Sequence, residues 1–264
     1  MTEPRPKRHW RCRLAWLFAG AIAIAVVFEV GRAIPLVAPG LFFEHEATFP
    51  DFDLYSDAPL DSSWPAILAE SRSRLRELPL RMDRDRSTLI VCQTVGTYRW
   101  MARLVGRSPR SQGFNVHLLG TTVLSMPYIQ WRRRQARPED APTLLNGTTA
   151  HVIAHEIVHQ RCGAFLGYWR YRNLPTWVRE GVAEYGAARN WRAANGWPLE
   201  RMRTAWPEAA LADLPEGLRP YIRGHLMVVW LVEVEGMALT DLLNTSPDAG
   251  AVWKRMGAKS PDPF

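Results

Sequence analysis

The segment from Ala150 to Gln160 carries two histidines and a glutamate in the arrangement H-E-x-x-H. It reads AHVIAHEIVHQ and contains His155, Glu156 and His159. On an α-helix, positions four apart differ by only about 40° around the axis, so the two histidines project side by side. Two neutral imidazoles placed in this way can bind one Zn²⁺. Glu156 then lies beside the metal, where its carboxylate can take a proton from a water activated by the ion.

A catalytic zinc site needs a third protein ligand, and residues 175–185 offer two carboxylates. They read PTWVREGVAEY, and Glu180 lies 21 positions after His159, far enough for one helix to end and another to begin. Glu184 lies one helical turn beyond Glu180, on the same face. One carboxylate can complete a two-histidine, one-glutamate site, and the other can accept the free ring N–H of a ligand histidine. Gly181 leaves room for close packing of helices.

HEIVH followed by LPTWVREGVAEY resembles the gluzincin metallopeptidases of the peptidase-MA type, a group that includes thermolysin-like and aminopeptidase-like enzymes. The resemblance implies a zinc metallopeptidase that acts on a peptide or protein substrate. It implies that the zinc ligands are His155, His159 and Glu180. It also makes Glu156 the general base and places Glu184 behind a ligand histidine.

The resemblance covers roughly residues 85–260 and is firmest over 150–186. Two features depart from the family pattern. The spacing to Glu180 is slightly longer than in the best-known members. The Gly-x-Met-Glu-Asn signature of the aminopeptidase branch is absent, which disfavours an exopeptidase that reads a free amino terminus.

A later segment, residues 219–236, reads RPYIRGHLMVVWLVEVEG and resembles the family helix that carries a tyrosine. The resemblance assigns Tyr221 to stabilising the oxyanion of the tetrahedral intermediate, as a phenol donor near a metal can do. His225 lies one turn away on the same face and can do this instead. His151, one turn before His155, is interpreted as structural or as a hydrogen-bond partner, because one helix does not easily bring three histidines to one metal.

The elements that position these residues are strands in the first half of the chain and helices in the second. This order predicts the α+β class, here a zincin-like metallopeptidase domain with a small N-terminal sheet and a helical C-terminal part. Residues 131–140 are expected to form a charged loop, and the strand near 118–125 can offer its edge to an extended peptide. The remaining expected elements are strands over 87–93, 114–118 and 121–125, and helices over 62–78, 96–105, 148–165, 176–189 and 220–235.

The N-terminal region differs from the rest of the chain. The basic segment 1–13, expected in the cytoplasm, precedes an uncharged apolar run that reads LAWLFAGAIAIAVVF. This order predicts a signal anchor, a transmembrane helix over 14–34, in a single-pass protein of the cell membrane with an exported catalytic domain. Secretion after cleavage of a signal peptide is the alternative. A linker over 35–61 and a catalytic domain over 62–264 complete the predicted organisation.

Composition limits the class of protein. The chain has 264 residues, of which 47% are hydrophobic and 22% charged, values typical of a globular protein rather than a disordered one. The net charge is +7, but residues 1–13 hold five basic residues and one acidic residue, so most of the excess lies outside the expected folded body. This distribution argues against a nucleic-acid partner.

Two further questions stay open from the sequence. Cys92 and Cys162 either form a disulfide, which persists in an exported protein, or are two buried free thiols. The function is either peptide hydrolysis or, as the alternative, binding of a partner by an inactive exported domain of the same fold. The intact Glu156 favours the enzyme, since a scaffold does not need that residue.

Overall fold

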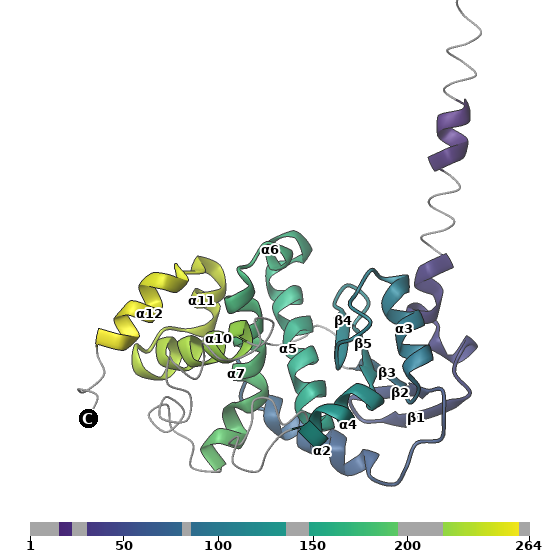
Figure 1. Ribbon diagram of the computed structural model, residues 1–264, viewed down its shortest axis with the longest axis horizontal. Helices are drawn as coiled ribbons and strands as arrows, with labels where there is room; N and C mark the ends of the chain where they lie inside the picture. Colours follow the sequence, from purple (N-terminus) through teal and green to yellow (C-terminus); the bar gives the residue numbers. More distant parts are fainter. Residues whose placement is uncertain (1–15, 23–30, 81–85, 136–147, 195–218, 259–264) are drawn as a thin grey trace, which may run out of the picture.

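The computed structural model describes residues 16–22, 31–80, 86–135, 148–194 and 219–258. It shows an α+β architecture in which a small mixed sheet is followed by a larger helical part. Figure 1 shows the sheet toward one end of the folded body, the C-terminal helices toward the other, and helix α5 between them.

The sheet has five strands in the order β1-β2-β3-β5-β4. β1 (His45–Phe49) and β2 (Phe52–Ser56) form an antiparallel hairpin, and β2 runs parallel to β3 (Ser87–Cys92). β3 runs parallel to β5 (Thr121–Ser125), and β4 (Gly113–Val116) pairs antiparallel with β5 at the edge.

Alternate side chains of a strand point to opposite sides of the sheet, and β3 is covered on both sides. Leu89 and Val91 belong to the larger apolar cluster, which is formed mainly with the helices of the second half. Ile90 and Cys92 belong to a smaller cluster formed with α3 (Val95–Leu104). This two-sided burial explains the continuous apolar run in the sequence.

Helix α5 (Thr149–Leu166) is buried along most of its length and packs against α2 (Trp64–Leu75), α7 (Thr176–Ala194), β4 and β5. The Thr148 side chain caps α5 by accepting a hydrogen bond from the backbone N–H of His151 at 3.1 Å. Further helical elements include the 3-10 turn η1 (Pro39–Leu41), α4 (Met126–Gln135), α6 (Tyr168–Arg172), α10 (Arg219–Val229), the π-helical turn η2 (Trp230–Val234), α11 (Leu239–Thr245) and α12 (Ala249–Ala258).

Three local predictions differ from the structure. Residues 131–135 continue helix α4 where a charged loop was expected, and 136–140 lie outside the described residues. The expected linker 35–61 contains the β1–β2 hairpin. The segment is acidic, but the β2 residues alternate between buried and half-buried positions, as in a strand of the sheet. β5 is paired on both sides, so within the described residues the free edge at this end of the sheet belongs to β4 and not to the segment near 118–125.

The fold prediction was wrong in its N-terminal transmembrane helix, and the expected membrane location is not supported. Within the described residues, no helix is long and apolar enough to cross a bilayer. Residues 16–22 and 31–37 are helical, and a spanning helix needs about 20 apolar residues. Residues 14–15 and 23–30 of the expected anchor, and the basic segment 1–13, lie outside the described residues.

The possible disulfide between Cys92 and Cys162 is not formed. Both are buried free thiols. Cys92 lies in the cluster that β3 shares with α3, whereas Cys162 lies on α5 in the cluster on the other face of the sheet. The sheet therefore separates the two side chains.

Candidate metal centre

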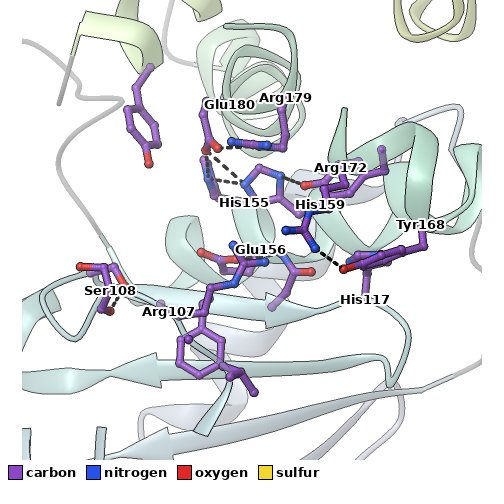
Figure 2. Close-up of a pocket in the computed structure, with 18 residues that line it drawn as sticks. Arg107, Ser108, His117, His155, Glu156, His159, Tyr168, Arg172, Arg179 and Glu180 are labelled. Atoms are coloured by element: carbon purple, nitrogen blue, oxygen red, sulfur yellow. Dashed lines mark hydrogen bonds and ion pairs between the residues drawn. The ribbon is translucent and has the colours of Figure 1, made fainter. Parts of the chain in front are cut away.

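Helices α5 and α7 bring His155, His159 and Glu180 together, although Glu180 is distant in sequence. The Nε2 atoms of the two histidines are 3.0 Å apart. Oε2 of Glu180 lies 3.5 Å from Nε2 of His155 and 3.3 Å from Nε2 of His159 (Figure 2). All three side chains are buried. The three residues assigned to the metal by the sequence thus point their donor atoms at one another.

The distances between these donor atoms match those expected around a small divalent ion. A tetrahedral ion with bonds of about 2.0–2.1 Å has neighbouring ligand atoms about 3.3–3.4 Å apart. The three separations, 3.0, 3.3 and 3.5 Å, bracket that value. The group can therefore hold a metal ion with three protein ligands.

The second ring nitrogen of each histidine, Nδ1, lies close to an oxygen of another side chain. Nδ1 of His155 lies 3.0 Å from Oε1 of Glu184, one turn beyond Glu180 on α7. Nδ1 of His159 lies 2.7 Å from the hydroxyl oxygen of Tyr171 on α6. With the proton on Nδ1, donation from His159 to the Tyr171 oxygen leaves the Nε2 lone pair of His159 free to bind a metal. Nδ1 of His155 is close to the Glu184 carboxylate but makes no hydrogen bond with it.

Glu184 also joins a second group of possible ligands. Its Oε2 lies 3.0 Å from Nε2 of His151, so the one carboxylate bridges the imidazoles of His151 and His155. The donors of His151, His155 and Glu184 are close enough for this group to hold a metal as well. The part of the chain that the structure describes thus offers two overlapping groups that share His155.

The electrostatics of the cluster keep its carboxylates ionised. Burial opposes this charge, but the adjacent histidines outweigh it and hold the pKa values of Glu180 and Glu184 well below their usual range. Burial also lowers the pKa of His155, but the carboxylates of Glu184 and Glu180 outweigh this and raise it well above the usual value. Ionised carboxylates suit a cation, whereas His155 must lose its extra proton to bind one.

Glu156 lies next to the three converging donors, on the side of the sheet (Figure 2). The side-chain amide of Asn115 on β4 donates a hydrogen bond to Oε2 of Glu156 at 3.1 Å. Gly113 on the same strand lies next to this side chain, since a Cβ atom there would be at an ordinary contact distance of 3.5 Å from Cγ of Glu156. Sequence reasoning missed Asn115, and the available signal was a polar residue inside the short apolar strand GFNV.

Tyr221 and His225 take different places on α10. Tyr221 lines the cleft beside the cluster, and its ring stacks on that of His155 with centroids 6.1 Å apart. Burial, followed by the charges of Glu180 and Glu156, raises the pKa of the Tyr221 phenol. His225 is fully buried and does not line the cleft. Of the two candidates, only Tyr221 has its side chain where a ligand can reach it.

The cluster forms part of the wall of a cleft with a volume of about 550 Å³. A second hollow of about 480 Å³ continues past Trp131 and Arg132 of α4 and shares His155, Glu156 and Tyr221 with the first. The sequence-predicted residues therefore lie at the junction of two hollows.

No protein-family model and no curated protein sequence matches this chain. The assignment of function consequently depends on the residues of the cleft.

Proposed function

We propose that this protein is a zinc-dependent peptidase of the gluzincin type. The observation that carries the proposal is the convergence of Nε2 of His155, Nε2 of His159 and Oε2 of Glu180, with Glu156 beside them in the same cleft. Two imidazole nitrogens and one carboxylate oxygen are a typical donor set of catalytic zinc sites, which keep their fourth position open. When bound, zinc supplies Lewis-acid chemistry by acidifying a water and polarising a carbonyl.

Glu156 is the general base of the proposed reaction. Its carboxylate takes a proton from the attacking water and later delivers it to the nitrogen of the leaving amine. The amide of Asn115 holds Oε2 of Glu156, which leaves Oε1 for the proton. Asn115 is thus a positioning residue, since it acts through the carboxylate that it orients.

Tyr221 supplies a hydrogen bond to the peptide carbonyl oxygen as that oxygen gains negative charge. Its raised pKa keeps the hydroxyl protonated, and hence a donor, throughout the neutral range. The buried His225 has no access to the cleft, which supports Tyr221 for this function.

Strand β4 is placed to hold an extended peptide next to these groups. Its residues Gly113, Phe114 and Asn115 line the cleft, and its outer edge has no neighbouring strand among the described residues. An added peptide strand can pair with this edge through main-chain hydrogen bonds. Such pairing brings a peptide bond alongside Glu156 without a deep side-chain pocket.

The proposal is tested by zinc content and hydrolysis measured on the full chain. After zinc loading and removal of loose metal, we expect about one zinc per chain and cleavage of a peptide library. Glu156→Gln should keep the zinc and lose cleavage, whereas the exposed Glu77→Gln serves as a matched control and should retain both. A folded, zinc-loaded protein that cleaves no peptide would support the alternative of an inactive binding domain.

A further inference from the structure

The cleft that holds the candidate metal ligands is rich in arginine. Arg107, Arg172 and Arg179 all line it. Nε of Arg179 donates to Oε1 of Glu180 at 3.1 Å, so its charge is paired. Arg107 and Arg172 have no carboxylate within ion-pair distance among the described residues. Two guanidinium groups in the cleft are therefore not neutralised by the described part of the chain.

Arg172 is held in place by an aromatic stack. Its Nη1 donates to the hydroxyl of Tyr168 at 2.7 Å. The Tyr168 ring stacks on His117 with centroids 5.3 Å apart and planes 21° from parallel. His117 in turn lies directly over Gly163 of α5, where a Cβ atom would be 2.7 Å from the imidazole ring. This wall is thus organised before any ligand arrives.

His117 adds a hydrogen-bonding group to the same wall. It lines the cleft, and its Nε2 is buried without a hydrogen-bond partner in the described part of the chain. A buried ring nitrogen without a partner is costly unless something else supplies one. Burial and then the charge of Arg107 lower the pKa of His117, so the ring is neutral and can donate through one nitrogen.

Arg107 enters from a different wall, the loop that follows α3. Gly106 takes a positive φ of 65° there, and the backbone N–H of Arg107 donates to the carbonyl of Ala102 at 2.8 Å. Figure 2 shows Arg107 on the side of the sheet and Arg172 on the side of α6, with His117 and Tyr168 beside Arg172.

We propose that Arg107, Arg172 and His117 form a subsite for a carboxylate of the bound peptide. Guanidinium groups suit this ligand because their N–H donors match the two carboxylate oxygens. The charge balance also favours an anion, since Glu156, Glu180 and Glu184 together offset a divalent cation and Arg179, while Arg107 and Arg172 remain uncompensated. Naming the carboxylate as part of a substrate rests on the proposed peptidase function.

Two sources can bring this group: an internal aspartate or glutamate side chain, or the C-terminal carboxylate of the peptide. The test uses zinc-loaded, full-length protein carrying Glu156→Gln, so that peptides bind without being cleaved. Fluorescent peptides of one sequence are compared with either glutamate or glutamine at successive positions, and with either a free or an amidated C-terminus.

We expect the preferred carboxylate peptide to bind about tenfold or more tightly than its neutral counterpart, an advantage that falls as salt is added. Preference for internal glutamate identifies the side-chain source, and preference for the free terminus identifies the C-terminal source. Arg172→Gln and Arg107→Gln should each reduce the preference. The matched control is Arg170→Gln, because Arg170 lies on the same helix but donates to the carbonyl of Asn244 outside the cleft.

Equal affinity for charged and neutral peptides overturns the subsite. So does a preference that survives Arg107→Gln and Arg172→Gln combined, or one that Arg170→Gln removes equally. The two proposals fail separately. If peptides bind selectively but the unsubstituted protein, which keeps Glu156, hydrolyses none, the subsite stands and the peptidase function is rejected. If the protein hydrolyses peptides without any preference for a carboxylate, the peptidase function stands and the subsite is rejected.

Discussion

A Cβ atom placed on Gly181 would lie 2.5 Å from the carbonyl carbon of Gly224, so helices α7 and α10 cross in direct backbone contact. This is the close packing expected at Gly181 from the sequence. The crossing also relates the site residues to one another, because α7 carries Glu180 beside Gly181 and α10 carries Tyr221 one turn before Gly224.

Gly181→Ala is expected to force these helices apart. The added methyl group meets backbone and not a flexible side chain, so the free energy of unfolding should fall by about 1–3 kcal/mol. Zinc affinity should fall as well, because Glu180 moves with α7. Denaturant unfolding measures the first effect, with Gly257→Ala on α12 as the control, since a Cβ there meets nothing within 4 Å. Equal stability of the two variants would contradict the close contact.

Zinc is expected to raise the melting temperature, because it binds the folded state. At a free concentration about 100-fold above Kd, one site adds about 2.7 kcal/mol to the stability. Glu180→Gln removes an anionic ligand and should abolish most of this thermal shift, whereas Glu156→Gln should preserve it. Calorimetry with and without a chelator provides the measurement. A full zinc shift in Glu180→Gln would remove this residue from the ligand set.

The two overlapping ligand groups can be told apart by their unshared histidines. If the metal sits between His155, His159 and Glu180, His159→Ala should lose the zinc and His151→Ala should keep about one per chain. Elemental analysis after removal of loose metal gives the answer. The opposite pattern would place the ion with His151 and Glu184 instead.

Glu184→Gln is expected to weaken zinc binding without removing it. The carboxylate lies 3.0 Å from Nδ1 of His155, one of the proposed metal ligands, and its charge favours a proton on that nitrogen. Loss of such an outer partner typically costs about 10–100-fold in metal affinity. A competition titration with a zinc chelator measures this change. An unaltered affinity would show that the Glu184 contact does not support the ligand.

Asn115→Ala is expected to lower kcat while leaving zinc content unchanged. A hydrogen bond to a charged group is worth about 1.5–3 kcal/mol, and this one holds a carboxylate oxygen of Glu156. The exposed Asn173→Ala on the surface of the molecule is the control. Steady-state kinetics separate the outcomes: a rise in KM with an unchanged kcat would mean that Asn115 binds peptide and does not position the base.

The group of possible metal ligands could be predicted from the sequence, because it depends on short-range spacing within two helices. Two histidines four residues apart must share one face of a helix, and a second helix with two glutamates one turn apart can approach that face. The strands and the main helices were also predictable, because alternation, apolar runs and caps are local properties. The expected membrane-spanning helix was wrong, since within the described residues no helix is long and apolar enough to cross a bilayer.

Other features depend on contacts between segments far apart in the chain, and only the tertiary structure decided them. The pairing of β4 outside β5 determined which strand edge is free and brought Asn115 to Glu156. The short helix α6 placed Tyr171 behind His159, and the sheet separated Cys92 from Cys162. Local residue patterns state which groups are available for chemistry, whereas the order of strands and the crossing of helices decide which of those groups meet.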